Sequence, residues 1–382
     1  MKYYIIAGEA SGDLHGANLM RGILKNDPQA EFRFWGGDRM AAVGGEQNLA
    51  QHYKNLSFFG FVGVVKHLPD ILGQLRECKA DIMSYSPDVL VLIDYPGFNL
   101  RMAKFAHGKG VKVFYYIAPK VWAWKESRVR QLRKYVDRLF IIFPFEVDYF
   151  AERGVAAEYK GNPLVDEIKA RKAKRPSREK FLAQNGLADD RPLVALLAGS
   201  RRSEIRYNLP FMAELAHRFP EYKFVIAGVP WLDRAEYDAI VGSSDVGFVC
   251  DRTYELLAYS EAAVITSGTA TLEAALIGTP EMVCYRTDHV SMNIGRIILK
   301  IRFISLVNLI MDREVVRELI QWDMTMPKAV AELRAILPGG ERREKMLEDF
   351  AKLRRLVGPA GASERIAARM VEILNELKPK LT

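Results

Sequence analysis

The first residue with a chemical role to consider is an aspartate that directly follows a strongly apolar segment. Residues 89–93 read Val-Leu-Val-Leu-Ile, which favours a buried parallel strand, and Asp94 comes next. A carboxylate at the tip of such a strand is well placed to act as a general base. The alternative is a cap on the following helix, predicted from about Leu100 to His107, and for that role Asn99 is the better candidate. We therefore expect Asp94 to be catalytic.

A second candidate lies where a short apolar segment leads through a Ser-Gly-Thr turn into a helix. Residues 262–265 predict a buried strand, and residues 270–277 have helical composition. The start of such a helix offers free N–H groups and a positive dipole, which suit a phosphate held near Ser267, Gly268 and Thr269. Glu273, about one turn further on, could accept hydrogen bonds from two neighbouring sugar hydroxyls. The alternative is a capped helix with a dipole-matched glutamate.

A third polar turn follows the first predicted strand, Tyr3–Ala7. The chain reads Gly-Glu-Ala-Ser-Gly-Asp before a helix expected from about Leu14, which places Glu9, Ser11 and Asp13 at the carboxyl edge of the sheet. The pattern is neither a dinucleotide fingerprint nor a P-loop, so neither NAD nor ATP follows from it. The alternative is a plain strand–turn–helix unit with a capping side chain.

A comparable turn follows the strand predicted at 193–197, where the chain reads Ala-Gly-Ser-Arg-Arg-Ser-Glu-Ile. A guanidinium beside a Gly-Ser turn at a helix start can hold a diphosphate from two directions. Ser200 and Arg201 are therefore candidate phosphate ligands, and the alternative for Arg201 is an ordinary surface arginine.

Aromatic, basic and apolar segments offer further surfaces. Trp122 and Trp124 form a rigid aromatic wall, suited to stacking on a sugar or to supporting a loop, and a basic helix at 125–134 follows. For that helix a solvated face is favoured over lipid or phosphate contact. The apolar stretch 57–65 either packs in the core or contacts a membrane, a partner or a lipid ligand. The basic amphipathic segment 290–310 either packs on its domain or lies on an anionic membrane.

Composition narrows the class of protein. The chain has 382 residues, of which 49% are hydrophobic and 27% charged, and a formal net charge of +8. The charge favours anionic partners, but no nucleic-acid-binding motif is present, so nucleic acid is not expected as a partner. The three cysteines have no metal or redox spacing. Without a run of 18 apolar residues or a signal pattern, we expect a cytoplasmic protein with no membrane span.

Strand and helix patterns alternate on both sides of a polar segment, residues 171–180. This alternation predicts an α/β protein with two doubly wound, Rossmann-like domains facing across a cleft. We place the first domain at residues 1–170 and the second at 171–344. Two charged helical segments follow, between about 345 and 382.

Six motifs in the expected order resemble those of the lipid A disaccharide synthases, inverting glycosyltransferases of the GT-B fold. They span much of the chain between residues 5 and 320: AGEASGD at 7–13, IDYPGFN at 93–99, VWAW at 121–124, GSRRSEI at 199–205, SGTATLEAAL at 267–276 and SLVNL at 305–309. The resemblance implies transfer of 2,3-diacylglucosamine from UDP to 2,3-diacylglucosamine 1-phosphate with a β-1,6 linkage. It also implies a peripheral enzyme on the cytoplasmic face of a Gram-negative inner membrane, a possible homodimer, and C-terminal helices that pack back on the first domain.

The resemblance also assigns roles to the candidate residues. Asp94 would be the base, supported by Asp13 or Glu9, while Arg201 and the turn 267–269 would stabilise the departing diphosphate. Glu273 would hold the ribose, and Asn308 would belong to the nucleotide-sugar site. Ser11, Asn99, Trp122 and Trp124 would serve the acceptor side. Because no D-x-D motif occurs, neither a metal nor a cofactor is expected.

Four positions depart from the family pattern. Gly97 stands where a second aspartate is usual, Gly63 replaces a glutamate, Asn162 a histidine and Val307 a proline. The acceptor contacts are therefore less well defined by the resemblance than the nucleotide site. The alternatives are another GT-B glucosaminyltransferase, a UDP-sugar epimerase of the same fold, or a non-catalytic basic module that binds membranes or nucleic acid.

Overall fold

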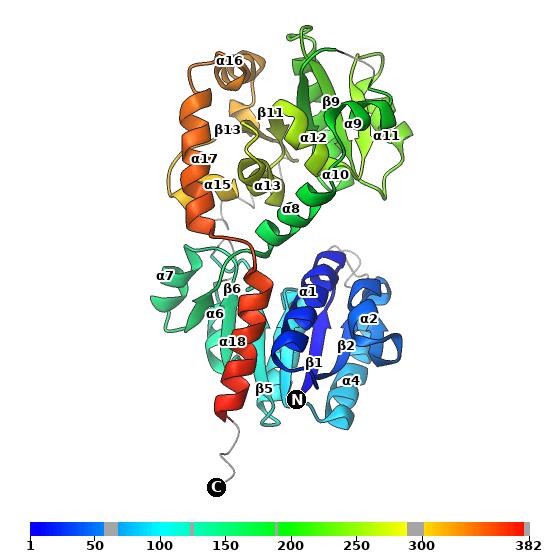
Figure 1. The fold of residues 1–382 in the computed structure, drawn as a ribbon, viewed down its shortest axis with the longest axis vertical. Coiled ribbons are helices and arrows are strands. Elements are labelled where there is room, and N and C mark those ends of the chain that lie inside the picture. Colours follow the sequence, from blue (N-terminus) through cyan, green and yellow to red (C-terminus); the bar gives the residue numbers. More distant parts are fainter. Residues whose placement is uncertain (57–67, 123–125, 188–189, 289–301, 378–382) are drawn as a thin grey trace. The chain divides into compact units, whose positions relative to one another are not determined.

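The computed structural model describes residues 1–56, 68–122, 126–187, 190–288 and 302–377 (Figure 1). The chain divides into two compact units, of which unit 1 comprises Met1–Asp166 with Ala360–Thr382 and unit 2 comprises Glu167–Pro359. The apolar stretch 57–65 with Gly63, Trp124 and most of the amphipathic segment 290–310 lie outside the described residues.

Unit 1 is built on a parallel sheet. Within the described ranges seven strands pair in the order β3-β2-β1-β4-β5-β6-β7, all parallel. The fully buried strand β4 lies near the middle, as its continuous apolar sequence predicts. The strands are β1 (Lys2–Ala7), β2 (Glu31–Gly36), β3 (Leu49–His52), β4 (Val89–Ile93), β5 (Lys112–Tyr116), β6 (Arg138–Ile141) and β7 (Ala157–Tyr159).

Helices cover both faces of this sheet (Figure 1). Because side chains alternate along a strand, Tyr3 and Ile5 of β1 belong to one hydrophobic cluster and Tyr4 to the other. Helices α1 and α18 contribute to the first cluster, and α4, α5, α6 and α7 to the second. The helices are α1 (Ala10–Asn26), α2 (Asp38–Gly44), α4 (Leu68–Tyr85), α5 (Pro96–His107), α6 (Arg128–Tyr135), α7 (Glu146–Ala151) and α18 (Ala362–Leu377), with short 3-10 turns at Glu46–Asn48 and Tyr53–Leu56.

The C-terminal helix α18 packs directly on α1. A Cβ at Gly22 of α1 would approach the side chain of Ala367 too closely, so the absence of a side chain there allows the two helices to meet. Asp166 accepts hydrogen bonds from the backbone N–H groups of Gly361 and Ser363 at the start of α18. The last helix therefore belongs to the unit formed by the N-terminal part of the chain.

Unit 2 repeats the doubly wound plan. Its described strands form a parallel sheet in the order β10-β9-β8-β11-β12-β13. The strands are β8 (Leu193–Leu197), β9 (Lys223–Gly228), β10 (Gly247–Cys250), β11 (Ser260–Ile265), β12 (Glu281–Tyr285) and β13 (Glu318–Ile320). The helices are α8 (Pro163–Lys174), α9 (Arg178–Gln184), α10 (Arg202–Ala216), α11 (Arg234–Val241), α12 (Thr253–Tyr259), α13 (Thr269–Ile277), α15 (Leu306–Met311), α16 (Met326–Ile336) and α17 (Arg343–Val357), with a 3-10 turn at Gln321–Asp323.

The predicted fold class, two doubly wound α/β domains, is confirmed. The boundaries differ in detail from those expected, because the first falls inside α8 and the second after α17. The polar segment 171–180 forms the end of α8 and the start of α9. Of the two C-terminal helices, α17 belongs to unit 2 and α18 alone packs on unit 1.

Candidate active site

The order of strands places the candidate turns at equivalent points of the two sheets. In unit 1, β1 lies between β2 and β4, so strands that follow β1 in the chain are added first on one side of it and then on the other. In unit 2, β8 lies in the same way between β9 and β11. Ligands of open α/β sheets bind beyond the carboxyl ends of the strands at such a reversal. The loops after β1 and β4 carry Glu9 and Asp94, and those after β8 and β11 carry Arg201 and Gly268.

Asp94 is held in a strained conformation at the end of β4. The φ angles of Asp94 and Tyr95 are 45° and 47°, in the left-handed region that non-glycine residues rarely adopt. The N–H of Asp94 donates to the carbonyl oxygen of Tyr116 at 3.1 Å. Its own carbonyl oxygen accepts from the Tyr115 hydroxyl at 2.6 Å and from Asn99 Nδ2 at 2.8 Å. The surrounding structure therefore fixes the backbone that carries the carboxylate.

The electrostatic environment of Asp94 suits a base. Burial raises the pKa of its carboxyl group above the ordinary value, and the positive charge of nearby Lys120 opposes part of that rise. A carboxylate with a raised pKa accepts a proton more readily than an exposed one. Lys120 was not among the residues selected from the sequence. In the sequence, the one feature that singles out Lys120 is its position just after the strand predicted at 111–117. In the structure, that strand pairs with β4, which Asp94 follows.

Tyr95 brings the loops after β1 and β4 together. Its ring packs over Gly8, where any side chain would collide with it. Burial and then the negative charge of Glu9 raise the pKa of Tyr95, so Glu9 lies close to the Asp94 loop. Ser11 is exposed in the first turn of α1, which begins at Ala10 rather than near Leu14 as expected.

Two predicted site residues of unit 1 serve the backbone instead. The buried carboxylate of Asp13 accepts hydrogen bonds from the N–H groups of Gly37 (2.7 Å), Arg39 (3.1 Å) and Met40 (3.0 Å), which caps α2. Asp13 therefore has a structural role, and its support of the base stays a prediction. Asn99 was expected to cap α5, but that helix starts at Pro96 and the buried Asn99 amide instead stabilises the end of β4.

Trp122 supports a loop. Its Nε1 donates to Glu146 Oε1 at 3.0 Å, and its ring packs edge-on against Phe143 and Phe145. Burial raises the pKa of Glu146 to about 7, although its hydrogen bonds from Phe143 N and Trp122 favour the ionised form. Of the two alternatives for this aromatic pair, the loop-supporting role fits Trp122, while Trp124 lies outside the described residues.

Two of the departures from the family pattern lie in packed positions. Asn162 is buried, with its Nδ2 donating to Ile142 O and its Oδ1 accepting from Leu164 N, both at 2.9 Å. Val307 is fully buried in α15. At exposed Gly97 an added Cβ would meet no atom of the described residues within 4 Å, so their packing does not demand a glycine there.

In unit 2, the helix α13 begins as a phosphate-binding turn would require. Gly268 is its N-cap residue, and among the described residues no side chain caps the helix and no atom lies within 4 Å of the position that a Cβ at Gly268 would take. The first N–H groups of a helix lack partners within the helix and are available to an anion. The Ser267 hydroxyl donates to Ile304 O at 2.7 Å, which ties this turn to the segment before α15.

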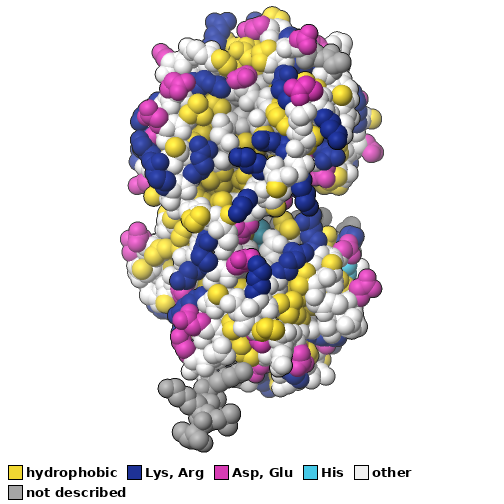
Figure 2. Space-filling model, in the orientation of Figure 1, with side chains coloured by type: hydrophobic (Ala, Val, Ile, Leu, Met, Phe, Trp, Pro, Cys, Tyr) yellow, Lys and Arg dark blue, Asp and Glu magenta, His cyan; other side chains and the backbone are white. Residues whose placement is uncertain are grey.

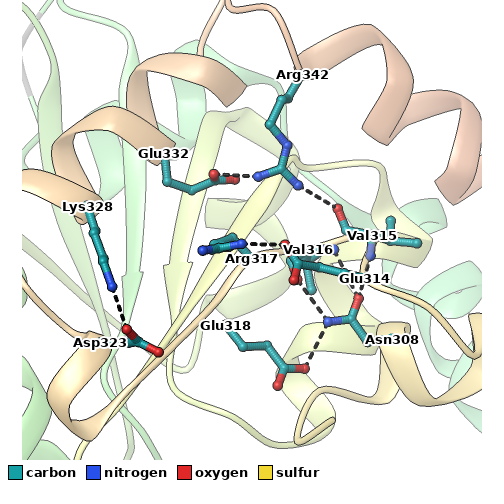
Figure 3. Close-up of polar contacts among 10 residues, drawn as sticks. All are labelled: Asn308, Glu314, Val315, Val316, Arg317, Glu318, Asp323, Lys328, Glu332 and Arg342. Carbon is teal, nitrogen blue, oxygen red and sulfur yellow. Dashed lines mark hydrogen bonds and ion pairs between the residues drawn. The ribbon is translucent and has the colours of Figure 1, made fainter. Parts of the chain in front are cut away.

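The Asn308 side chain binds the turn after α15 that leads into β13 (Figure 3). Its Oδ1 accepts from Val315 N at 2.7 Å and Val316 N at 3.0 Å, while its Nδ2 donates to Val316 O at 2.8 Å and Glu318 Oε1 at 2.9 Å. All four hydrogen-bonding positions of the amide are therefore occupied. Asn308 is fully buried and has a structural role, and its assignment to the nucleotide site stays a prediction.

Replacing Asn308 by alanine should lower the free energy of unfolding by about 3 kcal/mol or more, because two buried N–H groups lose their acceptor. Urea denaturation followed by circular dichroism measures the loss. Asn185→Ala is the matched control, since that amide donates a single hydrogen bond, to Phe181 O. If Asn308→Ala kept wild-type stability but lost UDP binding, the result would show that Asn308 contacts the nucleotide.

The Arg201 side chain is exposed and can reach a ligand, although it also pairs with a glutamate of the helix that it precedes. Its side chain is 79% exposed, and its guanidinium lies 3.2 Å from the Glu204 carboxylate. The other Glu204 oxygen accepts from Ser200 N and Arg201 N. The backbone donors of this turn are thus already satisfied by a capping carboxylate, which leaves the guanidinium as the group that can turn towards a diphosphate.

Glu273 lies in a partly buried polar cluster. The Tyr254 hydroxyl donates to Glu273 Oε1 at 3.1 Å, and the Arg171 guanidinium stacks 4.8 Å from the Tyr254 ring centre. Burial raises the pKa of Glu273 to about 7, with the charge of Glu167 adding to the rise and the Tyr254 hydrogen bond opposing it. The second carboxylate oxygen remains for a ligand hydroxyl.

The surface charge is dispersed on the face in view. Lys and Arg side chains are spread over both units in Figure 2, with Asp and Glu among them. Within the described ranges no helix is long and apolar enough to cross a membrane. The same part of the chain contains no group of three or more His, Cys, Asp or Glu side chains arranged to hold a metal ion.

Comparison with known proteins assigns the family. A model of the family described as lipid-A-disaccharide synthetase matches residues 3–368. The chain belongs to this family. Proteins named lipid-A-disaccharide synthase from Myxococcus xanthus and Geobacter sulfurreducens are 39% and 36% identical to it, with 97% of each chain covered in both comparisons. The resemblance noted in the sequence is confirmed, and membership makes the chain a glycosyltransferase.

Solved structures agree with this family at the level of fold. A UDP-GlcNAc 2-epimerase from Neisseria meningitidis bound to UDP-GlcNAc has a TM-score of 0.66 at 13% identity, covering 97% of this chain and 100% of its own. A glycosyltransferase from Siraitia grosvenorii in complex with UDP has a TM-score of 0.61 at 13% identity, covering 98% and 99%. At this identity the likeness concerns the GT-B architecture alone.

Proposed function

We propose that the chain transfers 2,3-diacylglucosamine from its UDP derivative to the 6-hydroxyl of 2,3-diacylglucosamine 1-phosphate. The products are the β-1,6-linked disaccharide 1-phosphate and UDP. One observation carries the proposal: relatives named for this synthase match the chain over 97% of both lengths.

Asp94 is the proposed base. Its carboxylate takes the proton of the acceptor hydroxyl as that oxygen attacks the anomeric carbon of the donor, and the bond to UDP breaks with its electron pair on the β-phosphate. The raised pKa and fixed backbone of Asp94 support this role. Glu9, close to the same loop, is the candidate to orient the acceptor.

The nucleotide is the proposed ligand of unit 2. The N-terminus of α13 and the exposed guanidinium of Arg201 would balance the charge that develops on the leaving diphosphate. The Glu273 carboxylate would accept hydrogen bonds from the ribose hydroxyls. These roles need no side chain of the buried Asn308.

Arg201→Ala should weaken UDP binding about 10-fold to 100-fold, the effect of losing a charge-assisted hydrogen bond. Isothermal titration calorimetry with UDP measures it. Arg202→Ala is the control, because that neighbouring arginine is already paired with Glu236 at 2.6 Å. Unchanged affinity in Arg201→Ala, or an equal loss in the control, would remove Arg201 from the diphosphate site.

Product analysis tests the reaction itself. The purified chain is incubated with UDP-diacylglucosamine and diacylglucosamine 1-phosphate in detergent, and the lipids are examined by mass spectrometry for the disaccharide phosphate. A parallel incubation with UDP-GlcNAc alone tests epimerisation, the activity named for several structures of similar fold. An epimerised UDP-sugar without disaccharide would contradict the proposal.

We also infer that the chain works as a peripheral protein on the cytoplasmic face of an inner membrane. Both proposed substrates carry acyl chains that reside in a bilayer. The net charge of +8 favours an anionic surface.

A further inference from the structure

A pocket on unit 1 has no part in the chemistry described above. It has a volume of about 380 Å³ and is lined by Glu126, Ser127, Val129, Arg130, Arg133 and Arg153. We call it the arginine pocket. Most of its lining comes from α6 and the two residues before it, and Arg153 comes from the turn that follows α7, on the same flank of unit 1 (Figure 1).

Two of its arginines have no acidic partner among the residues that the structure describes. Within the described part of the chain, no carboxylate lies within 4.0 Å of the Arg130 or Arg133 guanidinium, and both side chains are exposed. Three arginines against one glutamate leave the lining with a net charge of +2, of which Glu152, just outside the lining, balances one through its 3.2 Å contact with Arg153. Unpaired guanidinium groups beside one cavity repel one another, and an anion bound there would relieve that repulsion.

The third arginine is held in place. The Arg153 guanidinium lies 3.8 Å from the Tyr149 ring centre, donates through Nε to Glu126 Oε1 at 2.9 Å, and donates through Nη1 to Tyr149 O at 3.0 Å. A guanidinium fixed from several sides loses less freedom when a ligand binds than a mobile one does. Arg153 therefore gives the pocket one rigid wall.

The lining indicates what kind of anion fits. Arginine is the residue best matched to phosphate, because its planar fork donates two parallel hydrogen bonds. None of the described lining residues is aromatic, so a nucleotide base would find no ring on which to stack. The buried side chain of Val129 adds an apolar contact. A phosphate on a small, flexible alcohol satisfies these features better than a nucleotide.

We propose that the arginine pocket binds the phosphate of an anionic lipid headgroup and so gives unit 1 a specific contact with an anionic bilayer. The assignment rests on the proposed peripheral association with a membrane, since it locates part of that association. It also gives a function to α6, which covers most of the basic segment for which the sequence alone favoured a solvated face. The pocket is separate from the groups assigned to catalysis.

The test compares Arg130→Gln/Arg133→Gln with the wild-type protein in sedimentation with phosphatidylglycerol vesicles. Each basic side chain at an anionic surface contributes roughly 1 kcal/mol, so loss of two predicts about 30-fold weaker binding. Lys172→Gln/Lys174→Gln in α8 is the matched control, because it removes the same charge from exposed side chains elsewhere and should bind nearly as the wild type does. Circular dichroism and UDP affinity verify that each variant is folded.

Further arms separate the sources of phosphate. Phosphatidylcholine vesicles and inorganic phosphate should bind weakly, and turnover with substrates dispersed in detergent should stay at the wild-type level in Arg130→Gln/Arg133→Gln. An equal loss of vesicle binding in both double variants would contradict the proposed role of the arginine pocket, while the proposed membrane association would still hold. Tight binding of inorganic phosphate without vesicle binding, or a raised KM for the acceptor in detergent, would also overturn it. If wild-type protein fails to bind anionic vesicles, the proposed membrane association fails as well.

Discussion

Asp94→Asn is expected to lower turnover by about 100-fold or more, the range for losing a general base, while UDP affinity stays unchanged. The amide keeps the shape of the side chain but cannot accept the proton of the acceptor hydroxyl. Because burial raises the pKa of Asp94, the wild-type kcat/KM should fall with decreasing pH at a pH above the ordinary aspartate range. The measurement is the rate of UDP release across pH, with calorimetry for affinity.

Asp137→Asn is the matched control for this result. Asp137 directly precedes β6, so it lies at the amino-terminal ends of the strands, whereas Asp94 lies at their carboxyl ends. Its carboxylate accepts a hydrogen bond from Val113 N at the start of β5. Its replacement should affect stability more than turnover. Near-wild-type turnover in Asp94→Asn, or an equal loss in Asp137→Asn, would show that the carboxylate at the end of β4 is not the base.

Glu273→Ala is expected to weaken UDP binding about 100-fold, because two hydrogen bonds from the ribose hydroxyls to a charged acceptor are lost. The pKa of about 7 adds a pH signature. Only the ionised carboxylate accepts both hydroxyls well, so wild-type affinity should rise between about pH 6 and 8. The same calorimetric pH series on Glu273→Gln serves as the reference, because UDP itself titrates equally in both experiments. The UDP affinity of Glu273→Gln should not rise between these pH values. Equal pH profiles in the two proteins would contradict the ribose assignment.

The same pKa shift has a predictable effect on stability. The Glu273 pKa is raised in the folded state from 4.5 to about 7, so the folded protein holds that proton more tightly than the unfolded chain. Its contribution to stability is therefore largest below about pH 4.5 and is lost as the pH rises to about 7. Ligand binding in this pH range has to be compared at equal fractions of folded protein.

Strands that consist of apolar runs could be predicted from the sequence, and so could the partly exposed edge strand β10, whereas the edge strands β3 and β7 could not. The runs at 89–93 and 193–197 mark β4 and β8, which are buried along their whole length. The edge strand β3 and the short strand β7 have partly exposed residues throughout and no apolar run that would reveal them. The carboxyl ends of the predicted central strands were sufficient to locate Asp94 and the 267–269 turn.

Side-chain roles that depend on distant partners were not predictable. The carboxylate of Asp13 binds backbone N–H groups 24 to 27 residues away, and Asn308 binds the turn that leads into β13. Both residues lie inside motifs that also contain candidate ligands, so their motif membership suggested direct contact. The helix predicted from about Leu100 starts at Pro96 instead, because proline is well accommodated in the first turn of a helix.

The configuration of the newly formed glycosidic bond is the most direct test of a single displacement driven by Asp94. The disaccharide made from an α-linked UDP donor is isolated, and its anomeric proton coupling is read by nuclear magnetic resonance. Attack by a hydroxyl deprotonated in place predicts the β anomer, with inversion at the anomeric carbon. An α-linked product would mean retention and would contradict the account.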